Sequence, residues 1–358
     1  MKKVFIAISG ITLLIGLFLW LRSGQAEVIY QENVPEIPLP NEVSSKIVWP
    51  READDVEDAG EASAVAVNSD GDLYYLHRSA AGFADDQIIE DPVVVVIDGE
   101  TGKVKDKWGT GIFKSPHGME IDHENRVWVT DISLNKVFTF SSDGQLLQSF
   151  GDDYPFYLEP ILQMRNELPQ TPVSMSETTF ARPTDITVFE DGSFAVSDGY
   201  RNSRVVKFTE NGEVEWEHDR LGNNLQSFYL PHGITHDKEG NIYVADRSNA
   251  RIQVLNKEGK IIDTWDQPEL GRPFGLEVSH DQELYVVSGG NTLYPEGGDG
   301  LHQLVKMDLS GQIVERFGVH GEGAGELGLP HDVAVGVKGE VYIAELRNKR
   351  VQAFVFED

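Results

Sequence analysis

Short apolar segments separated by polar turns recur along most of the chain. Many of the turns contain a Gly after a polar residue, as in Asp70-Gly71 and Asp191-Gly192. Gly readily adopts positive φ, so these pairs suit the tight turn of a β-hairpin. No segment shows a convincing helical periodicity of apolar residues. The pattern therefore predicts an all-β fold built from many short strands.

The apolar segments form copies of one repeat, with a period of roughly 40 to 50 residues. Complete copies begin at Pro116, Pro183, Pro231 and Pro273. A diverged copy begins at Ala62, and a shorter copy begins at Pro330. A blade of four short strands is typical of this period, so six copies predict a six-bladed β-propeller.

The N-terminal region has a different composition. Two lysines precede an uncharged apolar run over residues 4–21, whose length lies between a signal-peptide core and a membrane span. Gly24 and Ala26 offer a small-x-small cleavage pattern. Residues 1–26 are therefore predicted to be either a cleaved signal peptide or an uncleaved N-terminal membrane anchor. Either one places the rest of the protein outside the cytoplasm, secreted or anchored to the membrane.

The segment after this leader is acidic and contains several prolines. We interpret residues 27–44 as an extended acidic linker and residues 45–358 as the propeller. The copy at Pro330 holds only three of the four strands. We predict that residues 46–49 supply its outer strand and close the ring without an exposed edge.

Charge and cysteine content narrow the possible partners. The net charge of −29 argues against nucleic-acid binding and against adhesion to anionic lipid, so membrane contact is expected only through the N-terminal segment. The charge is compatible with solubility outside the cell and with cation binding. The chain has no cysteine, so its stability must come from packing, ring closure and metal ions rather than from disulfides. We expect a monomer.

A Pro-His pair begins the first strand of the second, fourth and sixth blades, at His117, His232 and His331. First strands line the channel of a propeller, and alternate blades are related by about a third of a turn. The three imidazoles are therefore expected to converge. Three histidine nitrogens with an open fourth position are the ligand set of a catalytic zinc site. The alternative is that Pro-His merely starts the strand, as Pro does before Thr184 and Phe274 in the third and fifth blades.

Asp332 directly follows the third histidine, where the other two copies have Gly118 and Gly233. A carboxylate at the channel suits a hard cation such as calcium. The alternative is an Asp that caps a turn through hydrogen bonds.

The second strands end in an acidic residue, which we interpret as structural because it recurs in blade after blade. Chemistry is expected where the blades differ. Tyr200 and Arg247 come just after such an acid, and Arg78 occupies the matching place in the first blade. These three side chains are predicted to surround the mouth where the histidines meet, although each by itself fits a surface arginine or a packed tyrosine.

Four motifs carry a family resemblance: "SPHGMEIDHENRVWVTD", "PTDITVFEDGSFAVSDGYRNSRVVKF", "LPHGITHDKEGNIYVADRSNARIQ" and "LPHDVAVGVKGEVYIAE". Over roughly residues 60–358 the chain resembles the NHL-repeat peptidyl-α-hydroxyglycine α-amidating lyase domain of peptidylglycine α-amidating enzymes. The resemblance implies a six-bladed propeller with a catalytic zinc and a structural calcium. It also implies cleavage of a peptidyl-α-hydroxyglycine into a peptide amide and glyoxylate.

The resemblance assigns roles to residues of this chain. His117, His232 and His331 match the zinc ligands. Asp332 matches the calcium carboxylate, with Val65 and Met119 where the family lends backbone carbonyls. Tyr200 matches the catalytic tyrosine, and Arg78 and Arg247 match the arginines around the substrate. The implied substrate is a small molecule or a peptide derivative that carries a carboxylate.

One departure and two alternatives accompany the resemblance. Animal members of the family carry a disulfide beside the tyrosine, where this chain has Arg201. One alternative function is a non-catalytic NHL propeller that binds a protein or peptide partner. The other is a metal-dependent hydrolase, for example one that acts on a lactone.

Overall fold

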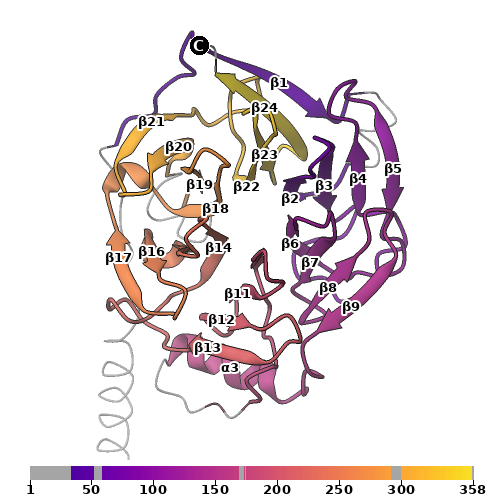
Figure 1. Ribbon diagram of the computed structural model, residues 1–358, viewed down its shortest axis with the longest axis vertical. Coiled ribbons are helices and arrows are strands. Elements are labelled where there is room, and N and C mark those ends of the chain that lie inside the picture. Colours follow the sequence, from indigo (N-terminus) through magenta and orange to yellow (C-terminus); the bar gives the residue numbers. More distant parts are fainter. Residues whose placement is uncertain (1–33, 52–58, 169–172, 174, 292–299, 357–358) are drawn as a thin grey trace, which may run out of the picture.

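The structure is a computed structural model that describes residues 34–51, 59–168, 173, 175–291 and 300–356. Within these ranges six four-stranded antiparallel sheets surround a central channel (Figure 1). The predicted six-bladed β-propeller is confirmed. No helix in the described part of the chain is both long and apolar enough to cross a membrane. The predicted leader and residues 27–33 of the predicted linker lie outside the described residues.

Five blades are built from four consecutive strands each. Blade 1 contains β2 (Ala62–Val67), β3 (Leu73–His77), β4 (Val94–Ile97) and β5 (Val104–Trp108). Blade 2 contains β6 (Pro116–Ile121), β7 (Val127–Asp131), β8 (Lys136–Phe140) and β9 (Leu146–Phe150). Blade 3 contains β10 (Asp185–Val188), β11 (Phe194–Asp198), β12 (Arg204–Phe208) and β13 (Val214–His218). Blade 4 contains β14 (Pro231–His236), β15 (Ile242–Asp246), β16 (Arg251–Leu255) and β17 (Ile261–Trp265). Blade 5 contains β18 (Pro273–Val278), β19 (Glu283–Gly289), β20 (His302–Asp308) and β21 (Ile313–Phe317).

Blade 6 joins the two ends of the described chain. It contains β22 (Pro330–Val335), β23 (Val341–Glu345) and β24 (Arg350–Phe356), and its outer strand is β1 (Val43–Trp49). β1 pairs antiparallel with β24, with Lys46 opposite Ala353. The prediction that residues 46–49 complete this blade is therefore confirmed, and the strand extends further toward the N-terminus than predicted. Trp49 is only 2% exposed and packs in the core between blades 6 and 1.

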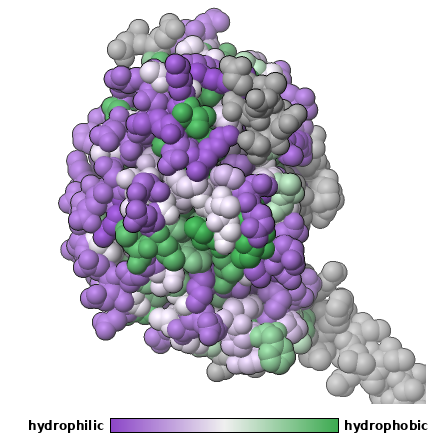
Figure 2. Space-filling view, turned by 90° about the vertical axis from the view of Figure 1, so that its right-hand side faces the viewer, coloured by the Kyte–Doolittle hydropathy of each residue, from purple (hydrophilic) through white to green (hydrophobic). Residues whose placement is uncertain are grey.

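The hydrophobic core lies between neighbouring blades. Six clusters of buried apolar side chains each join two adjacent blades, so together they follow the whole ring. Outer strands carry more polar residues, and Figure 2 shows a mostly hydrophilic surface with one hydrophobic band on the side of the ring that bears β5 and β9. Exposed apolar side chains on these two strands are Val104, Leu146 and Leu147. Because the apolar contacts join every blade to the next, the fold positions the first strands of all six blades around one axis.

One α-helix, α3 (Leu158–Glu167), lies in the connection between blades 2 and 3. Short 3₁₀ turns, η1 (Arg247–Asn249) and η2 (Pro268–Leu270), occur in blade 4 and after it. The sequence pattern predicts no convincing amphipathic helix, so α3 is a departure from that prediction. Its buried residues are Leu158, Leu162 and Arg165, which give too few apolar positions for a clear helical pattern.

Candidate metal centre and surrounding groups

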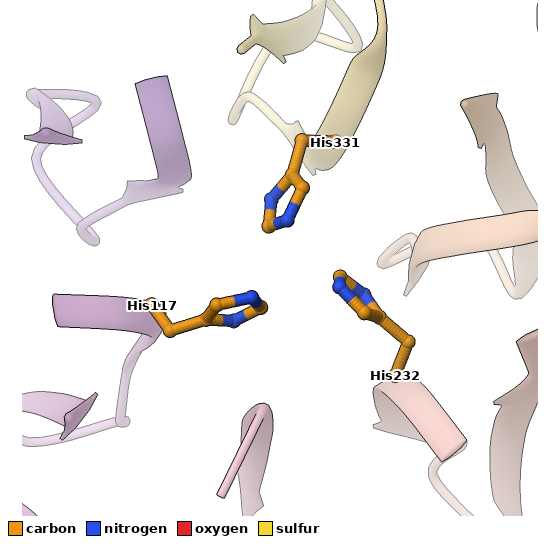
Figure 3. Close-up of side chains that lie close together, drawn as sticks. All are labelled: His117, His232 and His331. Carbon is orange, nitrogen blue, oxygen red and sulfur yellow. The ribbon is translucent and has the colours of Figure 1, made fainter. Parts of the chain in front are cut away.

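The three predicted histidines meet at the channel axis. Each is the second residue of a first strand: His117 on β6, His232 on β14 and His331 on β22. The ring centroids are 4.7 to 4.9 Å apart in all three pairs, and the three side chains point toward one another (Figure 3). One ligand nitrogen from each lies within 4.8 Å of the other two. The arrangement has the approximate three-fold symmetry expected for alternate blades.

Each histidine is held by the backbone of the next blade. The Nδ1 atoms of His117, His232 and His331 lie 2.7, 3.0 and 2.6 Å from the carbonyl oxygens of Thr184, Phe274 and Ser63, respectively. A carbonyl only accepts hydrogen bonds, so each Nδ1 carries the proton and donates it. The Nε2 atoms are therefore unprotonated and can act as ligand atoms, and the tautomer is fixed in the way typical of metal-binding histidines.

The electrostatic surroundings keep the three rings neutral. Burial lowers the pKa of His117 and of His232 well below the ordinary value, and the pKa of His331 falls to about 3 for the same main reason. The guanidinium group of Arg247 lowers all three pKa values further, and that of Arg78 lowers the pKa of His117 and of His331. Neutral imidazole is the form that binds a metal, so the site is ready for a cation without first losing protons.

Tyr200 reaches the histidines from the loop after β11. Its hydroxyl lies 2.9 Å from Nε2 of His117 and 3.3 Å from Nε2 of His232. Gly199 explains how the loop fits: a Cβ atom there would lie 1.9 Å from the carbonyl oxygen of Pro231. Only Gly allows this close approach between the tyrosine loop and the strand that carries His232.

Arg247 borders the same site from blade 4. Its guanidinium carbon lies 4.5 Å from the ring centre of Phe274 and 5.6 Å from that of Tyr200. The side chain is buried, at 4% exposed, and it forms no ion pair with any residue that the structure describes. A buried cation held by aromatic faces retains donors for an anionic ligand.

Arg78 follows β3 in blade 1 and is 1% exposed. Its Nη1 atom forms an ion pair with Glu61 at 2.8 Å, and its Nε–H donates to the Pro116 carbonyl at 3.3 Å. The Nη2 atom is buried and has no hydrogen-bond partner in the described part of the protein. An unsatisfied buried donor is costly, so this atom indicates where an acceptor from a ligand would bind.

The acids at the ends of the second strands are structural, as predicted. Ion pairs join Asp198 to Arg204, Asp246 to Arg251 and Glu345 to Arg350. The same carboxylates accept main-chain N–H groups of the loops before the first strands. They therefore tie the end of the second strand in each of these blades to the loop that precedes its first strand.

A second group of polar residues lines the channel beyond the histidines. Asp332, Val65 and Met119, predicted from the family resemblance, border one cavity of about 90 Å³. The Val65 N–H donates to Oδ2 of Asp332 at 3.0 Å. Burial raises the pKa of Asp332 to about 7, so a cation is the natural means of stabilising its ionised form.

Three further carboxylates line this cavity and were not predicted: Asp185, Glu120 and Glu277. Burial raises the pKa of each, and repulsion from another carboxylate of the cavity adds to the effect. For Glu277 the pKa rises to about 8. Asp185 belongs to blade 3, opposite Asp332 in blade 6, while Glu120 and Glu277 belong to the opposite blades 2 and 5. The channel thus holds two pairs of facing carboxylates next to the histidines.

Three segments of the chain match the NHL repeat family, at residues 180–208, 228–255 and 327–354, in blades 3, 4 and 6. "Peptidyl-alpha-hydroxyglycine alpha-amidating lyase 1" of Drosophila melanogaster is 30% identical over 287 residues, which cover 75% of this chain and 49% of the relative. "Peptidyl-alpha-hydroxyglycine alpha-amidating lyase 2" of the same organism is 28% identical over 341 residues, which cover 88% of this chain and 75% of the relative. The chain therefore spans about half the length of the first relative.

The chain is a six-bladed NHL-repeat propeller related to these lyases. A solved streptogramin B lyase structure is similar to the propeller with a TM-score of 0.59 and 14% identity, and the match covers 88% of this chain and 98% of that chain. At this identity the likeness concerns the fold alone.

The propeller brings together most of the residues singled out in the sequence. The three histidines, Tyr200, Arg78 and Arg247 surround one point, while Asp332, Val65 and Met119 line the adjacent cavity. A further cavity of about 500 Å³ opens beside Tyr200 and is bordered by α3. A larger groove of about 800 Å³ between β13 and β17 contains none of the predicted site residues. Arg201, where animal members of the family carry a cysteine, forms an ion pair with Glu159 of α3 at 3.0 Å.

Proposed function

We propose that the propeller is a zinc-dependent carbon–nitrogen lyase that cleaves an N-acyl-α-hydroxyglycine into an amide and glyoxylate. The observation that carries the proposal is the meeting of three unprotonated Nε2 atoms with the Tyr200 hydroxyl beside two buried arginines. In this reaction the hydroxyl of the carbinolamide loses its proton, the C–N bond breaks and the amide nitrogen gains a proton. The atoms balance without water or an oxidant.

The arginines are suited to bind the carboxylate of such a substrate. Arg78 offers the buried Nη2 atom, and Arg247 offers a guanidinium with no ion pair among the described residues. Planar guanidinium groups bind carboxylates in a fixed orientation, which would direct the adjacent carbon toward the histidines. Binding at a fixed distance from Tyr200 supplies the positioning that this bond cleavage requires.

Tyr200 is the candidate base. Its hydroxyl is in hydrogen-bond contact with the Nε2 atoms of His117 and His232, so it lies beside the place where the substrate hydroxyl would bind. A phenol within hydrogen-bond reach of a reacting hydroxyl can act as its general base. The proton that Tyr200 removes from the hydroxyl is the one that the amide nitrogen needs, so the same group can take and return it.

The three histidines fit a zinc ion. They provide neutral nitrogen donors whose tautomers are fixed, and three such ligands leave a coordination position open. A bound zinc ion would stabilise the negative charge that develops on the substrate oxygen.

We also propose that calcium binds at the channel carboxylates. Asp332 with the Val65 and Met119 backbone forms the predicted part of the site, and Asp185 adds a second carboxylate from the opposite blade. Calcium takes six to eight oxygen ligands in proteins. Metal analysis of the purified protein is expected to give one zinc per chain, with calcium lost on washing with a calcium-selective chelator.

The first experiment incubates the protein with N-benzoyl-α-hydroxyglycine and measures glyoxylate and benzamide. The two products are expected in equal amounts, with activity lost on removal of zinc and restored by its return. Tyr200→Phe is expected to abolish turnover while zinc stays bound. His123→Ala, at an exposed histidine, is the control and should retain full activity.

The products also separate the alternatives. A hydrolase that cleaves the amide would release benzoate instead of benzamide. A non-catalytic propeller would release neither product and would not need zinc, whereas a lactone hydrolase would release neither product and would lose its lactone cleavage on removal of the metal. Retained activity in Tyr200→Phe would remove the tyrosine from the mechanism and leave the metal-dependent reaction standing.

A further inference from the structure

The helix α3 lies in an unusually long connection between blades. Residues 151–184 join β9 to β10, whereas residues 109–115 suffice to join blades 1 and 2. The apolar contact of α3 is small: Leu158 and Leu162 pack with Ala181 in a separate cluster. Its other contacts with the propeller are polar, and they go to the loop that carries Tyr200, to Arg182 before β10 and to Asp219 after β13.

Glu159 binds one arginine in the loop that carries Tyr200 and one in the segment before β10. Its Oε1 atom accepts hydrogen bonds from Nη2 of Arg182 and from Nε of Arg201, both at 3.0 Å. Arg201 directly follows Tyr200 in the chain, and the Arg182 carbonyl accepts the Tyr200 N–H at 3.3 Å. The Tyr154 hydroxyl donates to the other carboxylate oxygen of Glu159, Oε2, at 3.0 Å and helps to fix the orientation of the carboxylate. The Glu159 carboxylate therefore links the two backbone segments that meet at Tyr200, one containing Arg182 and the other containing Arg201.

Two more residues of α3 bind the main chain of the loop itself. The side-chain amide of Asn166 donates to the Tyr200 carbonyl at 3.2 Å. Arg165, which is 8% exposed, donates to the Asn202 carbonyl at 2.6 Å and to the Asn202 side chain at 3.1 Å. Arg165 also donates to the Asp219 carbonyl at 3.0 Å, which joins the loop to the segment after β13. The backbone is thus held on both sides of the residue whose hydroxyl reaches the histidines.

The tyrosine ring packs edge-on against His117 and His232, with ring centres 5.2 and 5.9 Å apart, and those contacts hold the ring but not the backbone of its loop. Phe83 also meets the ring, at 5.0 Å between ring centres, but Phe83 is 49% exposed. The backbone of the loop makes one further hydrogen bond outside itself, from the Arg201 N–H to the Ala181 carbonyl at 3.2 Å. Because a reacting group misplaced by about 1 Å can cost about 100-fold in rate, the polar contacts of α3 have a direct catalytic consequence.

We infer that α3 is the element that positions Tyr200, with Glu159, Arg165 and Asn166 as positioning residues. The inference rests on the proposed function, since it assigns to α3 the placement of the proposed base. The helix acts through Tyr200 and touches neither the histidines nor the two arginines that are candidates for binding the carboxylate. It should therefore affect the bond-breaking step and leave substrate binding and metal binding nearly unchanged.

The test compares Glu159→Ala with Met164→Ala in the full-length protein. Met164 lies on the same helix and is 50% exposed, so its replacement controls for changes to α3 in general. With N-benzoyl-α-hydroxyglycine, Glu159→Ala is expected to lower kcat about 10- to 100-fold and to change KM less than about threefold. Glu159→Gln keeps the acceptor oxygen and should recover part of the loss. Zinc content should be the same in all four proteins.

A second variant and a structural measurement complete the test. Asn166→Ala removes a single hydrogen bond to the loop and should lower kcat in the same direction if Glu159→Ala proves unstable. Crystal structures of both variants should show the Tyr200 hydroxyl displaced from its 2.9 Å contact with His117. An undisplaced hydroxyl, an unchanged kcat, or a loss confined to KM would overturn the inference. If the unmodified protein releases no glyoxylate, the proposed function fails, and the position of the hydroxyl still decides whether α3 positions Tyr200.

Discussion

Replacing Glu277 by Gln should make the stability of the cation-free protein less sensitive to a rise in pH from about 4.5 to about 8. Burial and the carboxylate of Asp332 in the neighbouring blade raise the pKa of Glu277 from 4.5 to about 8. An acid whose pKa is higher in the folded state keeps its proton up to a higher pH there than in the unfolded chain. The free energy of unfolding must therefore fall as the pH rises from about 4.5 to about 8, and it levels off above that range.

The size of the change in unfolding free energy follows from the pKa shift of Glu277. One pKa unit corresponds to about 1.4 kcal/mol, so the shift of Glu277 sets a limit of about 5 kcal/mol on its contribution. Glutamine fills nearly the same volume and carries no charge at any pH, so it removes this penalty. Bound calcium should act in the opposite direction, because a cation in the channel favours the ionised carboxylates.

The assay is denaturant unfolding at pH 5 and pH 8, in a chelator and in calcium. In the chelator, the unmodified protein should lose more stability between the two pH values than Glu277→Gln does. In calcium, the difference between the two proteins should shrink or reverse. Glu258→Gln, at an exposed position on the hairpin between β16 and β17, should behave like the unmodified protein. An identical loss of stability for Glu277→Gln and the unmodified protein in the chelator would refute the reasoning.

Three other predictions concern the ring and the site. Trp49→Ala should lower the free energy of unfolding by about 3–5 kcal/mol, because it removes a buried side chain that packs between blades 6 and 1. Ile47→Ala, at a more exposed position on the same strand, should have a small effect, and chemical denaturation measures both. His232→Ala should abolish stoichiometric zinc binding, and a variant that retains one zinc per chain in metal analysis would contradict the three-histidine site. Arg247→Ala should lower kcat/KM for an α-hydroxyglycine substrate about 10- to 100-fold, mostly by raising KM, because a charged partner of the substrate carboxylate is lost. Initial-rate kinetics that show no change in KM would exclude that role.

The sequence repeat allowed the six-bladed fold and the convergence of the three histidines to be predicted. A Pro at or just before the first strand of five blades sets their alignment, and His117, His232 and His331 then fall on alternate blades. Their convergence follows from symmetry alone and requires no side-chain detail. The closing strand was predictable for a similar reason, since the last repeat lacked one strand and Trp49 lay in the nearest apolar segment.

Other features left a weaker signal. Asp185 follows Pro183 and Thr184 just as Asp332 follows Pro330 and His331, so this carboxylate could have been found by aligning the third and sixth blades. Glu120 and Glu277 lie two residues farther along opposite blades, and only the geometry of the channel brings them near the aspartates.

The helix α3 gave no periodic pattern because it is held by charged and amide groups. Apolar periodicity detects helices that bury an apolar face, and α3 buries only Leu158 and Leu162 in that way. The contacts of Glu159 and Asn166 depend on loops far away in sequence, at Arg182 and Tyr200. Such polar docking becomes visible only when the fold has placed both partners.

The hydrogen bonds from the histidine Nδ1 atoms make metal loading a measure of ring integrity. Blades 2, 4 and 6 supply the ligands, but blades 3, 5 and 1 supply the carbonyls that orient them, at Thr184, Phe274 and Ser63. Every blade thus takes part in one small centre, and the bond from His331 to Ser63 crosses the junction where the two ends of the ring meet. A propeller cut between blades 2 and 3, 4 and 5, or 6 and 1 would keep all three histidines, but one of them would lose the carbonyl that orients it, so the proposed zinc ion should bind more weakly. The affinity for that metal should therefore report whether these three junctions of the ring are closed.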